Sequence, residues 1–211
     1  MTQVAETKGE KAARRGVDKF AERRSQLAES ALLTLSELGY ARTSLREIAQ
    51  HSEFSHGVLH YYFSDKVDLI MACIRQYKAR CVTRYDQIVY SAQTAAELRR
   101  EFAAGLARTV AEDAPMHRLW YDIRTQSMFE KDFQPDVAEI DQSLERMIWR
   151  IVSKYAELSG FAPAVSERVA YALYDGLFQQ TLLRLLHGQA DAPGELQQAA
   201  EELMGQLVPG P

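Results

Sequence analysis

The stretch TSLREIAQHSEFSHGVLHYYFSDK, residues 43–66, decides the fold of the first part of this chain of 211 residues. Apolar residues recur within it at helical spacing, and Ser44 precedes them with Glu47 three positions later. A serine followed by a glutamate at this spacing forms a capping box, in which each side chain accepts a hydrogen bond from the other residue's backbone. Ser55 offers a second cap before another apolar run. The sequence therefore predicts two short helices across a tight connection.

The second of these helices has the features of a helix that reads DNA. Leu59 and Phe63 lie four residues apart and are expected to face inward against the neighbouring helices. The other residues suit the second helix of a helix-turn-helix, whose start enters the major groove. Lys66 opens the following helix, where a cation opposes the helix dipole but suits a nearby phosphate. The residues expected to face outward are His56, Gly57, Val58, His60 and Tyr61.

The run from Leu27 to Leu69 resembles the DNA-binding domain of TetR-type transcriptional repressors. The resemblance implies an all-α fold of about nine helices, with an N-terminal helix-turn-helix domain of three helices and a C-terminal helical domain for ligand binding and dimerisation. It also implies a dimeric repressor that binds a palindromic operator and is released by a small effector. The matching residues are Leu38-Gly39-Tyr40, Thr43-Ser44, Arg46-Glu47-Ile48-Ala49, Ser55, Gly57, Leu59, Tyr62-Phe63 and Lys66.

Two residues depart from the family pattern. Glu53 stands where the connection usually holds a glycine with positive φ, so a glutamate there is expected to cost about 1 kcal/mol. His60 stands where the family usually has a tyrosine that contacts the DNA backbone, and its imidazole is expected to make the same contact. The residues predicted to bind DNA are Thr43, Ser44, Arg46, Ser55, His56, Gly57, Val58, His60, Tyr61, Tyr62 and Lys66.

Charge is distributed unevenly along the chain, whose net charge is -4. Residues 1–80 contain 13 Lys and Arg against 10 Asp and Glu, a net charge of +3, whereas residues 81–211 contain 12 against 19, a net charge of -7. This asymmetry suits an N-terminal DNA-binding module joined to an acidic body, although scatter alone can produce a difference of this size. The hydrophobic content of 46% is ordinary for a globular protein.

Neither membrane insertion nor secretion is predicted. The most apolar region, residues 171–186, is interrupted by Asp175 and other polar residues, and residues 1–26 lack the apolar core of a secretory signal. Cys73 and Cys81 lie eight residues apart in an expected helix, which separates them by roughly 12 Å along its axis, beyond the reach of a disulfide. A reducing cytoplasm is therefore the expected location.

Helical periodicity and capping residues divide the chain into three segments. Residues 1–18 are charged with little periodicity and are expected to form a mobile arm, either a solvated tail or a segment that touches phosphate. Residues 19–65 are expected to form the helix-turn-helix domain, and residues 66–211 the domain for ligand binding and dimerisation. The longer helices are expected over residues 20–38, 66–91, 94–112, 115–128, 135–158, 163–187 and 193–207.

Large side chains in the body are expected to line the effector cavity that the resemblance implies. Their character favours an apolar or aromatic effector, although each is alternatively an ordinary core residue. His117 and Arg124 are candidates to orient a polar group of the ligand, with a surface or capping role as the alternative. The candidate residues are Tyr77, Tyr85, Phe102, Leu106, His117, Trp120, Tyr121, Arg124, Met128, Phe129, Trp149 and Tyr174.

The last two expected helices predict a dimer interface. The helix over 163–187 is apolar on more than one side, and Gly176 in its middle costs about 1 kcal/mol relative to alanine, which a closely packed partner backbone would explain. The resemblance implies a four-helix interface across a two-fold axis, with burial inside one chain as the alternative. The predicted interface residues are Val169, Leu173, Gly176, Leu177, Gln180, Leu196, Ala200 and Leu203.

Catalytic and metal-binding functions fit the sequence less well. His56 and His60 lie four residues apart, a spacing that can bind a transition metal, but no cysteine or clear carboxylate partner shares their face. No Walker loop, Rossmann glycine pattern or nucleophile elbow occurs in the sequence. The sequence therefore predicts no enzyme, metal or cofactor. The strongest alternative is a ligand-binding or protein-binding module of the same fold that has lost DNA recognition through Glu53 and His60.

Overall fold

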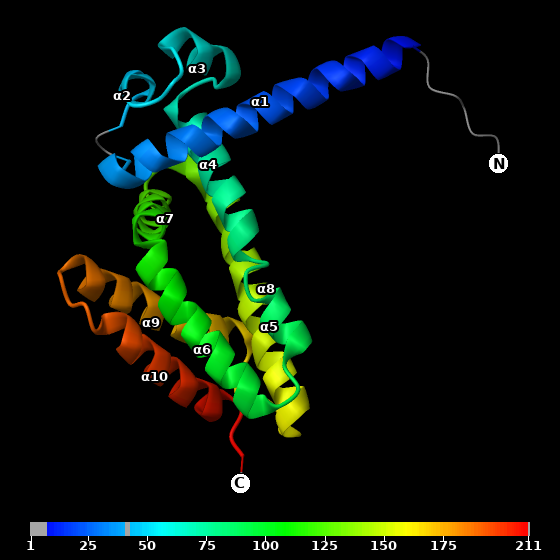
Figure 1. Cartoon of the computed structure of the whole chain (residues 1–211), viewed down its shortest axis with the longest axis vertical. Helices are drawn as coiled ribbons and strands as arrows, with labels where there is room; N and C mark the ends of the chain where they lie inside the picture. The colour runs from blue at the N-terminus through cyan, green and yellow to red at the C-terminus, as the bar shows by residue number, and fades with distance from the viewer. Residues whose placement is uncertain (1–7, 41–42, 211) are drawn as a thin grey trace. The chain divides into compact units, whose positions relative to one another are not determined.

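The computed structural model describes residues 8–40 and 43–210, and every regular element in them is a helix (Figure 1). The predicted all-α class is therefore confirmed. The chain divides into two compact units, one ending at Gln76 and one beginning at Tyr77. The division falls inside helix α4 (Lys66–Cys81), eleven positions beyond the boundary expected after residue 65. Each unit is described below by itself.

The first unit is built around a small core of leucine, isoleucine and phenylalanine side chains. Leu59 and Phe63 are fully buried in it, as their spacing predicted. The Arg24 guanidinium lies 4.8 Å from the centre of the Phe63 ring and forms an ion pair with Asp68, which ties the first helix to the start of α4. The helices that precede α4 are α1 (Lys8–Leu38), α2 (Leu45–Gln50) and α3 (His56–Tyr62).

Helix α1 begins earlier than the sequence analysis predicted. Residues 8–18, which were expected to belong to a mobile arm, are helical, and residues 1–7 of that arm lie outside the described residues. The segment is rich in alanine, lysine, arginine and glutamate, which have high intrinsic helix propensity. A helix can therefore extend through this segment although it lacks the apolar periodicity from which helices are usually recognised.

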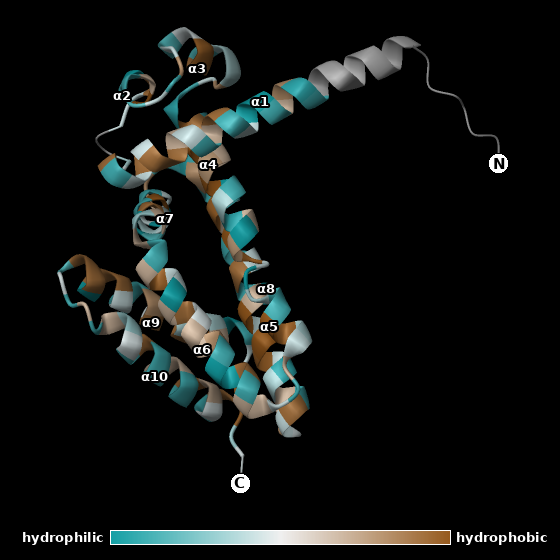
Figure 2. Ribbon diagram, in the orientation of Figure 1, coloured by the Kyte–Doolittle hydropathy of each residue, from teal (hydrophilic) through white to brown (hydrophobic). Residues whose placement is uncertain are grey.

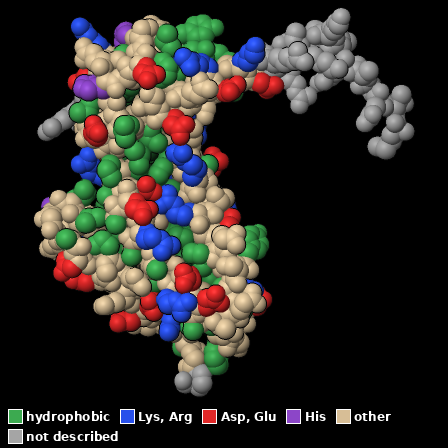
Figure 3. Space-filling view, viewed as in Figure 1, with side chains coloured by type: hydrophobic (Ala, Val, Ile, Leu, Met, Phe, Trp, Pro, Cys, Tyr) green, Lys and Arg blue, Asp and Glu red, His purple; other side chains and the backbone are tan. Residues whose placement is uncertain are grey.

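The second unit is a bundle in which α10 packs against α6 and α9, while α9 also packs against α7 and α8. Hydrophobic and hydrophilic residues alternate along α6, α8 and α10, as in amphipathic helices (Figure 2). On the face seen in Figure 3, acidic and basic side chains are interspersed along this unit. Its elements are α5 (Asp86–Ser91), α6 (Ala95–Glu112), α7 (Ala114–Gln126), the short 3₁₀ helix η1 (Lys131–Phe133), α8 (Gln134–Ser159), α9 (Glu167–Leu186) and α10 (Ala192–Leu207).

The single helix expected over residues 66–91 is two helices, α4 and α5. The Thr83 hydroxyl donates a hydrogen bond to the Arg80 carbonyl at 3.2 Å, and Arg150 from α8 donates to the Val82 carbonyl at 2.6 Å and to Asp86 at 2.8 Å. These side chains satisfy backbone groups where the helical ladder stops. The prediction of one continuous helix was wrong, and the Arg150 contacts at the break come from a distant helix that no local pattern reveals.

Two further expectations concern membranes and disulfides. Within the described residues, no helix combines the length and the apolar character that a membrane span requires. Cys73 and Cys81 are buried and are not paired in a disulfide, as their spacing in α4 predicted.

Candidate functional site

The two short helices of the first unit are held by the caps that the sequence predicted. The Ser44 amide donates to Glu47 Oε2 at 2.8 Å, and the Glu47 amide donates to Ser44 Oγ at 3.2 Å, which completes the capping box of α2. At α3, Ser55 Oγ accepts a hydrogen bond from the Val58 amide at 3.3 Å. Such caps fix the directions of the first turns, and with them the side chains that leave those turns.

The start of α3 presents several polar side chains to solvent. His56 and His60 are exposed, with their Nε2 atoms 3.1 Å apart, and Tyr61 is 72% exposed. Gly57 has open space where a Cβ atom would lie, so the backbone here can be approached closely. Arg46 on α2 is also exposed. Of the residues predicted to bind DNA, the exposed ones are Ser44, Arg46, Ser55, His56, Gly57, His60 and Tyr61, and the half-buried ones are Val58, Tyr62 and Lys66.

Thr43 and Lys66 have structural roles that the sequence analysis did not anticipate. Thr43 is only 3% exposed, and its hydroxyl donates to the Gly39 carbonyl at 2.6 Å, so the prediction that its side chain contacts DNA was wrong. Lys66 Nζ donates to the Tyr40 carbonyl at 2.6 Å and lies 4.0 Å from the centre of the Tyr40 ring. The lysine at the start of α4 therefore has a stabilising role as well as a predicted role at phosphate.

The connection between α2 and α3 does not need a glycine. Among the described residues, only glycines have positive φ, so Glu53 has an ordinary backbone conformation. The expected strain of about 1 kcal/mol is therefore absent. The Phe54 amide instead donates to Ser52 Oγ at 3.3 Å, which is one of the contacts that close this turn.

A cavity of about 70 Å³ lies inside the second unit, and side chains of α4, α6, α7, α8 and α9 form its wall. It brings together six of the candidate ligand-binding residues, namely Tyr85, Leu106, His117, Trp120, Tyr121 and Tyr174. Tyr77 and Phe102 lie behind this wall: Tyr77 contacts His117, and the Phe102 ring packs edge-on against Tyr85 and Tyr174. Tyrosine, tryptophan and phenylalanine make up six of the sixteen residues that line the cavity.

Besides Tyr77, Phe102 and Arg124, three more candidate residues do not line this cavity. Met128 and Phe129 follow the end of α7 and are 74% and 80% exposed, and Trp149, half-buried on α8, is not among the lining residues. They were predicted from their large side chains alone, but Met128 and Phe129 belong to the turn that leaves α7. The lining residues that the sequence analysis missed are Lys78, Cys81, Arg84, Thr109, Leu144, Met147, Ile148, Tyr171, Asp175 and Phe178.

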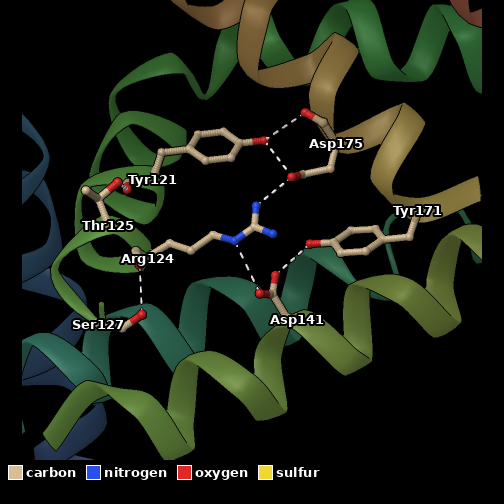
Figure 4. A network of polar contacts seen from close by, with 7 residues as sticks. All are labelled: Tyr121, Arg124, Thr125, Ser127, Asp141, Tyr171 and Asp175. Carbon is tan, nitrogen blue, oxygen red and sulfur yellow. Dashed lines mark hydrogen bonds and ion pairs between the residues drawn. The ribbon is translucent and has the colours of Figure 1, made fainter. Parts of the chain in front are cut away.

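Arg124 is the centre of a polar network that joins α7, α8 and α9 (Figure 4). Its guanidinium contacts Asp175 at 2.5 Å and Asp141 at 3.2 Å. Tyr121 donates to Asp175 at 2.9 Å, and Tyr171 donates to Asp141 at 2.6 Å. Burial and the neighbouring aspartates raise the pKa of both tyrosines, so their hydroxyls stay protonated and act as donors. Arg124 therefore holds three helices together rather than lying free at the surface.

His117 and Lys78 give the cavity its polar character beyond that network. His117 Nε2 lies 3.0 Å from the Tyr77 hydroxyl, and burial beside the cationic Lys78 and Arg84 lowers the pKa of His117 well below its usual value. Lys78 is 3% exposed, and burial lowers its pKa to about 8. The sequence did carry a signal for Lys78, because it follows Ile74 by four residues on the inward side of α4.

Helix α9 leaves part of its apolar surface uncovered. Val169 and Leu173, both predicted to lie in a dimer interface, are 44% and 43% exposed, and Gly176 and Gln180 are exposed on the same side. The α10 residues Leu196, Ala200 and Leu203 are instead buried within the chain, so their assignment to a surface between subunits was wrong. They face α6 and α9 because α10 packs into the bundle of its own unit.

Comparisons with known proteins agree on one family. Residues 27–73 match the sequence model of "Bacterial regulatory proteins, tetR family". The transcriptional regulator BetI of Paraburkholderia phymatum is 32% identical over 110 residues, covering 51% of this chain and 56% of that protein, so the match spans about half the length of the relative. BetI of Burkholderia thailandensis is 28% identical over 162 residues, covering 74% of this chain and 80% of that protein.

Solved structures support the same fold. The transcriptional regulator FadR of Bacillus subtilis, in complex with stearoyl-CoA, superposes with a TM-score of 0.70 at 16% identity, covering 85% of this chain and 96% of FadR. A transcriptional regulator of Saccharomonospora viridis, in complex with choline, superposes with a TM-score of 0.69 at 15% identity, covering 89% of this chain and 98% of that one. By the match over residues 27–73 and by these named regulators, the chain resembles regulators of the tetR family rather than enzymes.

Proposed function

We propose that this protein is a ligand-responsive repressor that binds operator DNA as a homodimer. The observation that carries the proposal is the surface of α3, where His56, Gly57 and His60 are exposed beyond the Ser55 cap. A short capped helix with exposed hydrogen-bonding groups at its start suits entry into the major groove. Exposed Ser44 and Arg46 on the neighbouring helix are available to contact phosphates, which position such a unit without reading sequence.

A second copy of the chain is the proposed partner at α9. Val169, Leu173, Gly176 and Gln180 follow one another at helical spacing and leave an apolar stripe exposed. Burying such a stripe against its symmetry mate forms an isologous interface, in which the same patch serves both subunits. A dimer of this kind would present two copies of α3 to the half-sites of a palindrome about one turn or slightly more apart.

The cavity in the second unit is the proposed effector site. The fold accommodates chemically different ligands, because FadR holds stearoyl-CoA and the Saccharomonospora regulator holds choline. In this chain the walls are largely aromatic and aliphatic, which favours an effector with an apolar or aromatic body. An effector that binds one conformation of the dimer better than the other shifts the population between them and so lowers affinity for the operator.

The test is a binding titration with a palindromic DNA fragment from the promoter region of the protein's own gene. Because cations that neutralise phosphates release condensed counterions, the logarithm of the affinity should fall linearly with the logarithm of the salt concentration. Arg46→Ala should weaken binding to all sequences and reduce that slope by about one per subunit contact, whereas Val58→Ala should change which bases are preferred. Arg100→Ala, a change at an exposed arginine on α6, is the matched control.

Absent or salt-independent binding would support the alternative of the same fold acting through protein partners alone. A wild-type protein that is monomeric in analytical ultracentrifugation would contradict the dimeric arrangement. Leu173→Arg places a charge in the proposed interface, so this variant should be monomeric where the wild type is dimeric.

A further inference from the structure

Lys78 is a buried cation that faces the cavity of the second unit without a polar partner. Among the described residues its Nζ atom has no hydrogen bond or ion pair, and it lies 4.7 Å from the centre of the Trp120 ring and 5.6 Å from the centre of the Tyr77 ring. Aromatic faces stabilise a cation only partly. Burying an ammonium group without hydrogen-bond acceptors is unfavourable, so most buried charges in proteins are paired.

The acidic groups around the cavity are already engaged with other partners. Asp175 and Asp141 accept from Tyr121 and Tyr171 and share the Arg124 guanidinium. The other cation of the lining, Arg84, is paired with Asp113 at 2.6 Å and donates to Thr109 at 3.1 Å. Neutral His117 is occupied by the Tyr77 hydroxyl. Asp175 and Asp141 lie near enough to Lys78 to favour its charged form, but Lys78 is the one charged group of the described lining with no direct hydrogen bond or ion pair.

We propose that the effector is an organic acid whose carboxylate accepts a hydrogen bond from Lys78 Nζ, and this inference rests on the proposed function of the cavity as the effector site. The body of the acid would pack against Trp120, Leu144, Met147 and Phe178, which supply apolar wall around the lysine. A cationic ligand would place like charges together without solvent. A neutral ligand would leave the ammonium unpaired, and a phosphate would need more donors than one lysine offers.

The size of the cavity determines whether a bound acid fits without moving the surrounding helices. A cavity of about 150 Å³ accommodates benzene in other proteins, so about 70 Å³ suits an acid with only a few carbon atoms. A longer or aromatic acid must displace wall residues of α7, α8 or α9. Larger acids are therefore expected to change helix packing, which is the response that an effector requires.

The first experiment is isothermal titration of the full-length protein with acetate, butyrate and hexanoate as probes. Butyramide and tetramethylammonium are the neutral and cationic controls. Butyrate should bind about tenfold to a hundredfold more tightly than butyramide, the range expected for one charge-assisted hydrogen bond. Lys78→Met should abolish that preference while Lys131→Met, a change at an exposed lysine, should leave it intact.

The second readout is proton linkage in the wild-type protein, which does not depend on any variant folding. Since the pKa of Lys78 is about 8 and a bound carboxylate raises it, acid binding above pH 8 should take up a proton and weaken as the pH rises. Butyramide binding should show neither effect. The charged and titratable groups around Lys78 are Tyr77, Cys81, Arg84, Tyr85, Asp113, His117, Tyr121, Arg124, Asp141, Tyr171, Tyr174 and Asp175.

The outcomes separate this inference from the proposed function. Butyramide or tetramethylammonium binding as tightly as butyrate, Lys78→Met binding butyrate like the wild type, or no probe binding at all would each overturn the carboxylate assignment. Operator affinity is measured separately with hexanoate present. Acids that bind through Lys78 without changing operator affinity would leave the carboxylate site standing and contradict its role as the effector site.

Discussion

The two units of this molecule place their candidate functional groups in opposite environments. In the first unit, His56, His60 and Arg46 are exposed, and they are oriented by caps within a few residues of them. In the second unit, Lys78 and Arg124 lie among side chains from several helices that are distant in sequence. The surface that is proposed to read DNA depends on local structure, whereas the cavity depends on how helices pack.

This difference has consequences for stability as well as for function. Exposed polar groups cost little to keep, because water solvates them in the folded and the unfolded chain alike. Buried polar groups must be matched by partners, and removing a partner leaves an uncompensated group in the interior. Substitutions in the two units should therefore show how much core packing, ion pairing and backbone conformation each contribute to the free energy of unfolding.

The largest effect is expected from the core beneath the DNA-reading helix. Leu59→Ala removes a fully buried side chain and should lower the free energy of unfolding of the first unit by about 3 kcal/mol, because it leaves a cavity. Urea denaturation followed by helix-specific hydrogen exchange measures it. Leu33→Ala, at an exposed leucine of α1, should change stability by less than about 0.5 kcal/mol, and equal losses would contradict the assignment of Leu59 to the core.

Loss of the Arg124 ion pairs in the second unit should lower the free energy of unfolding by a somewhat smaller amount. Arg124→Met leaves Asp141 and Asp175 without their shared cation and should lower the free energy of unfolding by about 2 kcal/mol, less than for a fully buried pair because the groups are partly exposed. Thermal or urea unfolding tests this. The control Arg100→Met removes an exposed ion pair with Glu101 and should hardly change the free energy of unfolding. An equal loss in the control would contradict the stabilising role of the Arg124 pairs.

Lys78→Met should change stability in the other direction. At pH 7 the variant should be more stable than the wild type by about 2 kcal/mol, because the buried ammonium is gone. Burial lowers the pKa of Lys78 from 10.5 to about 8, so both states of the wild type are protonated below pH 8 and the cost is fully present there. Between about pH 8 and 10.5 only the unfolded chain keeps the proton, and the wild type gains stability.

Urea unfolding of both proteins between pH 6.5 and 10 measures this convergence. Lys131→Met at an exposed position should show no such trend. A stability difference that stays constant or widens as the pH rises would show that Lys78 is not a buried cation near neutral pH.

The smallest effect tests the turn between α2 and α3. Since Glu53 has negative φ, Glu53→Gly should lower stability by about 0.5 kcal/mol through the added freedom of the unfolded chain. Had the position needed positive φ, the same substitution would stabilise the protein by about 1 kcal/mol. The sign of the change in urea unfolding therefore distinguishes the two conformations, and Glu47→Gly in α2, which also removes a cap, should be clearly more harmful.

Local signals predicted much of the fold. The beginning of α2 was predicted from Ser44 with Glu47, and that of α3 from Ser55. The end of α8 was predicted at Gly160, which has a φ of 79°. Predictions failed where a distant group intervenes. Arg150 from α8 binds the backbone where the helix expected over 66–91 divides in two, and burial against other helices removes Leu203 from the surface.

The sequence by itself determined the all-helical class, the capped pair of helices in residues 43–66 and the aromatic character of the body. Caps and periodicity act over a few residues, so they can be recognised without knowing which helices meet. Only the tertiary structure decided that Lys78 faces a cavity while Asp175 is taken by Arg124. Whether a buried charge finds a partner depends on helices that are distant in sequence, and no local pattern records that distance.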